Sequence, residues 1–191
     1  MQTTTEQLFT QARTANRYLD KAVDPALLYQ LYDLLKWGPT SANSSPARIQ
    51  FVTSAEAKAK LVACMSDSNQ AKTQSAPVTA IIGMDMQFYE RLPQLFLNAD
   101  ARSWFAGNQP AIDATAMRNS ALQGGYLIIA ARALGLDCGP MSGFNAAALD
   151  AAFWNGRTVK TNFVCTLGYA DHSTTYPRNT RLSFDEACQI V

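Results

Sequence analysis

Apolar residues recur with helical spacing along much of the chain. One such stretch begins at Asp24-Pro25, where an N-cap acceptor precedes proline at the first helical position, and it stops at Gly38-Pro39. The longest runs over 111–134 and is closed by Gly135. It contains Gly124-Gly125, a pair that weakens a helix unless another backbone packs closely there. We therefore expect two principal helices.

Three further stretches predict strands. Residues 48–53 alternate between apolar and polar, 78–84 form a continuous apolar run bounded by Pro77 and Asp85, and 161–169 are again apolar. Helices outnumber the strands and separate them. The sequence therefore predicts an α+β protein with three layers around a small central sheet. With no repeat, linker or low-complexity tract, we expect a single domain over 1–191.

Shorter helices are predicted from capping residues and apolar spacing. They are a helix over Thr5–Ala15, one with a Thr53/Glu56 capping box that runs to Met65, one from Asn145 to Trp154, and a C-terminal one capped by Ser183 and Glu186. The aromatic stretch 88–107 has no clear period.

Composition narrows the class of protein. Hydrophobic residues make up 48% of the chain and charged residues only 16%, which is low for a globular protein. A partner subunit would cover the apolar surface that this implies, although a monomer with an alanine-rich helical surface is an open alternative. The net charge of +1 gives no reason to expect nucleic-acid or membrane binding. No signal peptide or membrane-spanning run is seen, so we expect a cytoplasmic protein.

The usual catalytic side chains are sparse. Cys64, Cys165 and Cys188 lie among apolar neighbours and indicate buried, reduced thiols, and no CxxC pair is present. The single histidine, His172, cannot build a standard zinc site, so no metal is expected. The chain also lacks a GxSxG elbow, a GxGxxG fingerprint and a P-loop. We infer that no side chain of the protein is itself catalytic and that a cofactor supplies the chemistry.

Four polar clusters occur at the ends of predicted elements. They are Arg13-Thr14-Ala15-Asn16, the loop 38–46, the glycine-containing segment 139–144, and Arg178 to Arg181. Arginine and hydroxyl groups suit a phosphate, whereas amides and glycines suit the polar edge and flat face of a heterocycle. Taken singly, each cluster is also compatible with a solvated helix end, an ordinary turn or surface charge.

In their order and spacing, these clusters resemble the nitroreductase family of flavoproteins over essentially the whole chain. Arg13-Thr14-x-Asn16-x-Tyr18 resembles the family's Arg-Ser-x-Arg/Lys-x-Phe motif, and Trp37 to Pro46 resembles its Ala-Pro-Ser-Ser-x-Asn-x-Gln-Pro loop. Leu134 to Phe144 and Arg181-Leu182 resemble two further motifs. The stretches 37–48 and 100–105 resemble the branch that includes malonic semialdehyde reductase and NADH dehydrogenase/NAD(P)H nitroreductase.

The resemblance implies a nitroreductase-like fold with a mostly antiparallel sheet, in an intertwined homodimer with FMN at the interface. It assigns cofactor-binding roles to Arg13, Thr14, Asn16 and Arg181 from one subunit, to Pro39, Thr40, Ser41 and Asn43 from the other, and to Asn69, Lys72, Pro140, Met141, Ser142 and Gly143. Two departures stand out. Asn16 occupies the position of a cation and Ser142 that of a glutamate.

The activity implied is ping-pong hydride transfer from NADH or NADPH, through flavin N5, to a small acceptor. The acceptor is malonic semialdehyde, which becomes 3-hydroxypropionate, or a nitroaromatic or quinone. Trp104 and Phe105 would line the substrate pocket while Arg102 pairs with a substrate carboxylate; alternatively, a helix there packs both rings into the core. Two other functions are open: a non-catalytic flavin-binding or regulatory protein, and a helical interaction protein with no cofactor.

Overall fold

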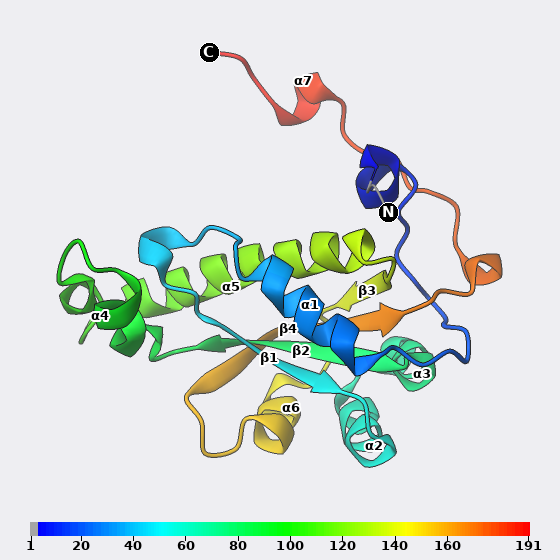
Figure 1. Cartoon of the computed structure of the whole chain (residues 1–191), viewed down its shortest axis with the longest axis horizontal. Helices are drawn as coiled ribbons and strands as arrows, with labels where there is room; N and C mark the ends of the chain where they lie inside the picture. Colours follow the sequence, from blue (N-terminus) through cyan, green and yellow to red (C-terminus); the bar gives the residue numbers. More distant parts are fainter. Residues whose placement is uncertain (1–3) are drawn as a thin grey trace.

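A four-stranded sheet lies at the centre of the molecule (Figure 1). The structure is a computed structural model that describes residues 4–191. The strand order is β1-β2-β4-β3, and each neighbouring pair is antiparallel. The strands are β1 (Ala47–Val52), β2 (Val78–Asp85), β3 (Asp137–Met141) and β4 (Val159–Gly168). β1 and β3 are therefore the two edges.

Helices cover both faces of the sheet (Figure 1). On one face lie α1 (Pro25–Leu35) and α5 (Gln109–Ala133), and on the other lie α2 (Ala55–Cys64), α3 (Asp67–Ser75) and α6 (Ala146–Phe153). The continuous apolar run of β2 follows from this arrangement, because Ile82 packs into the core under α1 and α5 while Ile81 packs into the core on the other face. The predicted three-layer α+β class is confirmed.

The remaining elements are short. They are η1 (Glu6–Thr10), η2 (Ser41–Asn43), η3 (Phe88–Arg91), α4 (Leu92–Leu95), η4 (Ala101–Trp104), η5 (His172–Thr174) and α7 (Phe184–Ala187). The aromatic stretch that showed no period in the sequence contains η3, α4 and η4, around a small core of its own that includes Phe88 and Phe105. Within 4–191, no helix is long and apolar enough to cross a bilayer.

Several local predictions were wrong. The predicted helix over Thr5–Ala15 is only the five-residue η1, because residues 12–16 turn toward the sheet and Thr14 bridges to Cys138. The N-cap of α2 is Ser54 rather than Thr53, since the Ser54 hydroxyl accepts a hydrogen bond from the backbone N–H of Ala57 at 3.2 Å.

Glu56 does not complete a capping box, because its carboxylate pairs with Lys60 at 2.8 Å. Neither α3 nor β3 was predicted from the sequence pattern. β3 is short and contains Pro140, which an edge strand tolerates because one side of its backbone needs no partner. By contrast, the predicted capping box at Ser183 and Glu186 is present.

The last part of the chain stands away from the body (Figure 1). Every residue from 176 to 191 is exposed, including Cys188, so the prediction that Cys188 is buried was wrong. Beyond Arg178, the hydrogen bonds recorded within 4–191 join tail residues only to one another. This tail, residues 179–191, therefore has no recorded hydrogen bond to the described part of its own body.

The glycine pair of α5 gives a test of the packing. A Cβ at Gly124 would lie 2.3 Å from the Phe163 ring, whereas a Cβ at Gly125 would meet no atom within 4 Å. The close neighbour is thus a side chain of β4 and not another backbone. We expect Gly124→Ala to lower the free energy of unfolding by about 1–3 kcal/mol through overpacking. Urea unfolding at one fixed protein concentration measures it.

Gly125→Ala is the matched control. It should raise the free energy of unfolding by about 0.5–1 kcal/mol, because alanine is the better helix former and space is free. Equal effects of the two substitutions would contradict this account of the α5–β4 contact.

Candidate functional site

Three of the four polar clusters meet near β3. The cluster at residues 13–16 and the arginines of the 178–181 segment face each other across a hollow of about 600 Å³. The polar and charged residues of its lining include Arg13, Thr14, Asn16, Arg132, Arg178, Asn179 and Arg181. The lining contains no aspartate or glutamate. Sequence reasoning missed Arg132, whose position inside a long helix gave no signal.

Backbone carbonyls hold these arginines in place. Arg13 donates to the carbonyl of Tyr176, and Arg178 donates to those of Thr10 (2.7 Å) and Ala12 (3.1 Å). Arg132 donates to the carbonyl of Leu8 at 2.8 Å. Among the ion pairs recorded in the described part of the chain, none involves these residues or Arg181. Their positive charges are therefore uncompensated, which suits an anion such as a phosphate.

The segment 139–143 connects this hollow to α3. A Cβ at Gly139 would lie 2.9 Å from the carbonyl oxygen of Ala15 and 3.2 Å from Cδ of Lys72, so only glycine lets the three pack together. The Asn69 amide donates to the carbonyl of Gly143 at 3.0 Å. Residues of clusters one and three thus lie close to Asn69 and Lys72 of α3.

Lys72 is half-buried, and burial lowers its pKa. It takes part in none of the ion pairs found between residues 4 and 191. Pro140 and Ser142 are exposed at the edge of the sheet, whereas the Met141 side chain packs into the core and leaves only its backbone for a ligand. An unpaired, partly desolvated ammonium beside exposed backbone suits a ligand with negative charge at its edge.

The loop that contains Pro39, Thr40, Ser41 and Asn43 is strained. Ala42, Asn43 and Ser45 have φ values of 50°, 49° and 39°, a region that residues other than glycine seldom adopt. Such strain persists where surrounding contacts impose it, and it occurs often at functional sites. Here Thr40 also closes the loop, since its hydroxyl accepts from the Ser45 N–H at 3.1 Å.

Two buried amides of α5 hold this loop. Asn119 accepts from the Ser41 N–H and Gln123 accepts from the Ala47 N–H, both at 2.8 Å. Sequence reasoning missed both, although polar residues four apart on the buried face of a helix were an available signal.

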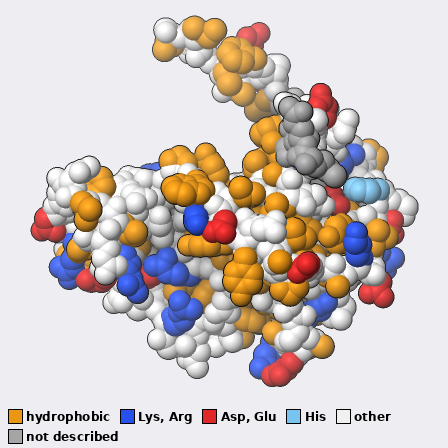
Figure 2. Space-filling model, in the orientation of Figure 1, with side chains coloured by type: hydrophobic (Ala, Val, Ile, Leu, Met, Phe, Trp, Pro, Cys, Tyr) orange, Lys and Arg blue, Asp and Glu red, His pale blue; other side chains and the backbone are white. Residues whose placement is uncertain are grey.

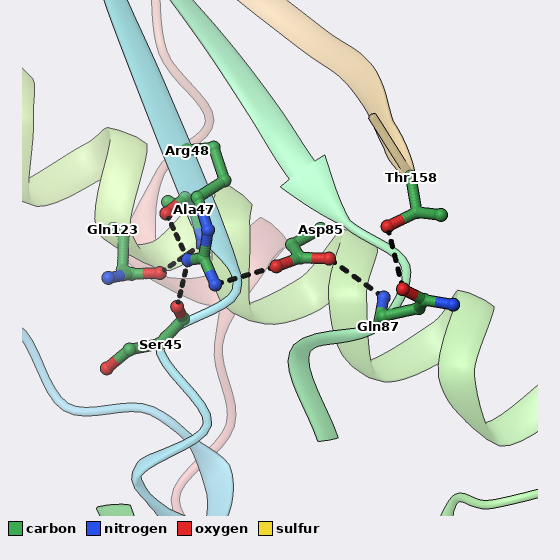
Figure 3. A network of polar contacts seen from close by, with 7 residues as sticks. All are labelled: Ser45, Ala47, Arg48, Asp85, Gln87, Gln123 and Thr158. Carbon is green, nitrogen blue, oxygen red and sulfur yellow. Dashed lines mark hydrogen bonds and ion pairs between the residues drawn. The ribbon is translucent and has the colours of Figure 1, made fainter. Parts of the chain in front are cut away.

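Arg48 completes the support of the loop (Figure 3). Its guanidinium donates to the carbonyls of Ser45 (3.0 Å) and Ala47 (2.9 Å) and pairs with Asp85 at 2.7 Å. Asp85 in turn accepts from the Gln87 N–H at 2.9 Å, which ties the end of β2 to the same network. The loop is therefore held by hydrogen bonds within the chain itself.

The three predicted substrate-binding residues have different surroundings. Phe105 is buried and packs edge-on against Phe88, with 5.0 Å between ring centroids. Trp104 is half exposed. Arg102 donates two hydrogen bonds of 2.8 Å to Glu90, and this contact holds the pKa of the Glu90 carboxyl below its ordinary value. All three residues belong to the aromatic stretch 88–107. This stretch contacts the strained loop, because the Asn43 amide donates to the carbonyl of Leu95 at 2.8 Å.

The fold and the site together define a three-layer α+β protein with an arginine-lined hollow beside an edge strand. No group of three His, Cys, Asp or Glu side chains within 4–191 is placed to hold a metal ion. The model of the Nitroreductase family matches residues 10–169, and the chain belongs to this family.

Relatives and solved structures agree with this assignment. The chain is 59% identical to a protein of Ralstonia nicotianae and 60% identical to one of Burkholderia lata, each provisionally named NADH dehydrogenase/NAD(P)H nitroreductase, over 97% of this chain and 95% of each relative. The fold is similar to that of a provisionally named nitroreductase from Exiguobacterium sibiricum solved in complex with FMN (TM-score 0.87, 19% identity, 100% of this chain and 99% of that one).

Lys72 supplies a test of the site that does not depend on activity. Because burial lowers the pKa of Lys72, the unfolded chain binds the lysine proton more tightly than the folded chain does. The charged lysine therefore lowers the free energy of unfolding at neutral pH. This loss of stability disappears as the pH rises above the ordinary pKa of lysine. We expect Lys72→Met to leave the melting temperature of the cofactor-free protein at pH 7 unchanged or to raise it by a few degrees. Differential scanning calorimetry measures it.

The control is Lys160→Met, which removes an exposed lysine with no recorded ion pair. It should change the melting temperature by less than about 2 °C. A marked fall with Lys72→Met alone would mean that the ammonium stabilises the fold.

Proposed function

We propose that the chain is an FMN-dependent NAD(P)H oxidoreductase that passes hydride to a small acceptor in ping-pong fashion. The observation that carries this proposal is the group of unpaired cations: Arg13 and Arg181 in the hollow, and Lys72 beyond Gly139. FMN carries a phosphate at one end and a polar heterocycle at the other. The arginines of the hollow suit the phosphate, and Lys72 suits the edge of the heterocycle. The residues present therefore fit the cofactor.

The residues have separate roles in this proposal. Arg13, Thr14 and Arg181 bind the phosphate, Asn16 and Asn69 bind the heterocycle edge, and Lys72 stabilises negative charge there. When bound, FMN supplies a hydride acceptor and donor at its N5. A backbone N–H of the segment Pro140 to Gly143 would donate to that nitrogen. Overall, NAD(P)H gives a hydride, solvent gives a proton, and an aldehyde acceptor becomes an alcohol.

The other flavin-binding loop, Pro39 to Asn43, comes from a second copy of the chain in this proposal. Asn119 holds the loop and Arg132 lines the hollow, and these residues lie 13 positions apart on α5. At 1.5 Å per residue, about 20 Å of helix separates the two halves in one chain. A homodimer that brings one half of each copy together would complete two sites.

The exposed tail supports an intertwined dimer. Leu182, Phe184 and Ile190 are largely exposed on it, and Figure 2 shows apolar side chains on the tail and on the face of the body below. Edge strand β1 and helix α1 border a groove of about 1000 Å³. The groove and the free edge of β1 suit an extended apolar segment such as the tail of a partner.

Substrate class is part of the proposal. Arg102 would pair with the carboxylate of an acceptor such as malonic semialdehyde, with Trp104 beside it, whereas Phe105 anchors the segment from the core. Nitroaromatics and quinones would be reduced without this contact.

Absorbance spectroscopy tests the proposed function. The purified protein should be yellow and should release FMN on denaturation, and NADH or NADPH should bleach the colour without oxygen. A quinone should then restore it, and steady-state rates should give parallel double-reciprocal lines. Colourless protein that does not take up added FMN would contradict the proposal, and a flavin that NAD(P)H does not bleach would indicate a non-catalytic carrier.

Removal of a phosphate-binding arginine should weaken cofactor retention. We expect Arg181→Ala to cost about 1.5–3 kcal/mol of FMN binding free energy, the contribution of a hydrogen bond to a charged group, and Arg13→Ala to do likewise. Fluorescence titration of the cofactor-free protein with FMN measures it. Arg157→Ala, which removes an exposed arginine remote in sequence from the hollow's lining, is the control. Unchanged FMN affinity in both test variants would remove the assignment.

A chain that ends at Arg181 tests the assembly. It keeps the cations of the hollow and lacks Leu182, Phe184 and Ile190, each of which contributes about 1.5–3 kcal/mol if buried by a partner. We expect the dissociation constant of the dimer to rise at least roughly 100-fold, with loss of FMN at micromolar concentration. Light scattering across a dilution series measures it. A shortened chain that remains a dimer with full FMN would refute the role of the tail.

A further inference from the structure

Glu90 and Arg102 form an ion pair that uses only one side of the guanidinium. Nε donates to Oε2 and Nη2 donates to Oε1, both at 2.8 Å. Within the part of the chain that the structure describes, Nη1 donates no recorded hydrogen bond. Because a guanidinium has five N–H donors in a fixed fork, its Nη1 end can still bind a second acceptor.

The pair rests on a rigid base. Glu90 lies in η3 beside the fully buried Phe88, and Arg102 follows the buried Ala101 in η4. Phe105 packs against Phe88, which joins the two short helices. Both charged side chains are nearly half exposed (45% and 46%), so their attraction contributes little to folding stability. The geometry is nevertheless well defined, which is what a ligand contact requires.

This base borders the strained loop. Ala42 packs against the same small core, and the Asn43 amide donates to the carbonyl of Leu95. The ion pair thus belongs to the segment next to the loop that the proposed function assigns to the flavin.

We infer that Glu90 is a specificity-determining residue that restricts carboxylated acceptors to those with a single negative charge. The inference rests on the proposed function, in which Arg102 binds the acceptor carboxylate. One carboxylate can accept from Nη1 of Arg102. A second negative charge on the acceptor faces Glu90, which already neutralises the arginine, and Asp100, whose carboxylate lies near enough to interact with it. Phosphorylated and dicarboxylated carbonyl compounds are therefore disfavoured.

The test compares two aldehydes, 4-oxobutanoate with one negative charge and glyceraldehyde 3-phosphate with two at pH 8. The variant Glu90→Gln keeps the size of the side chain and removes its charge. To first order, and with Arg102 in the same place, that change favours a dianion twice as strongly as a monoanion at the same position. We expect the ratio of kcat/KM values, dianion over monoanion, to rise roughly threefold or more at low salt. The rise should shrink at 0.5 M salt, because exposed charges are screened.

Glu56→Gln is the matched control, since it removes the same charge from an exposed glutamate–lysine pair on α2. Its ratio should equal that of the wild-type protein. The inference is overturned if the ratio does not rise in Glu90→Gln, if it rises equally in Glu56→Gln, if salt leaves it unchanged, or if the wild-type protein reduces no monocarboxylated aldehyde. Failure of the wild-type protein to oxidise NAD(P)H with an uncharged quinone would instead refute the proposed function.

Discussion

Helix α5 sets the scale of the site. Near its middle, Asn119 and Gln123 hold the strained loop, and close to its end Arg132 lines the cationic hollow. A straight helix cannot shorten, so the two halves of the site in one chain stay about 20 Å apart. Because the strained loop lies apart from the cationic hollow in one chain, the geometry of one helix makes assembly the natural route to a site that contains both. The proposed dimer follows from this constraint as much as from the apolar surface.

The strained loop illustrates how a sequence stabilises an unfavourable conformation. Three residues other than glycine with positive φ each carry a cost of order 1–3 kcal/mol. Asn119 and Gln123 accept from loop N–H groups, and Arg48 donates to loop carbonyls while it pairs with Asp85. These contacts are buried or half-buried, where unmade hydrogen bonds are expensive, so the loop cannot relax without leaving polar groups unpaired. The result is a rigid loop whose remaining donors can meet a ligand.

Most of the architecture could be predicted from the sequence, because long elements carry a strong period. The apolar run of β2 and the leucine spacing of α1 are examples. Short elements that depend on tertiary contacts could not. β3 forms because β4 offers it a partner, and η1 ends early because Thr14 pairs with Cys138. In the site, the arginine clusters were visible as motifs, whereas Arg48–Asp85 and Arg102–Glu90 join residues whose proximity only the fold creates.

Charge is distributed unevenly between the arginine-lined hollow and the segment that contains Arg102. The hollow near β3 concentrates arginines without carboxylates, so it favours an anion. In the segment next to the strained loop, Arg102 is paired with Glu90 and lies near Asp100, so attraction for an anion there is local and weak. A tightly held anion at one place and a loosely held one at the other is the arrangement that a resident cofactor and an exchanging substrate require.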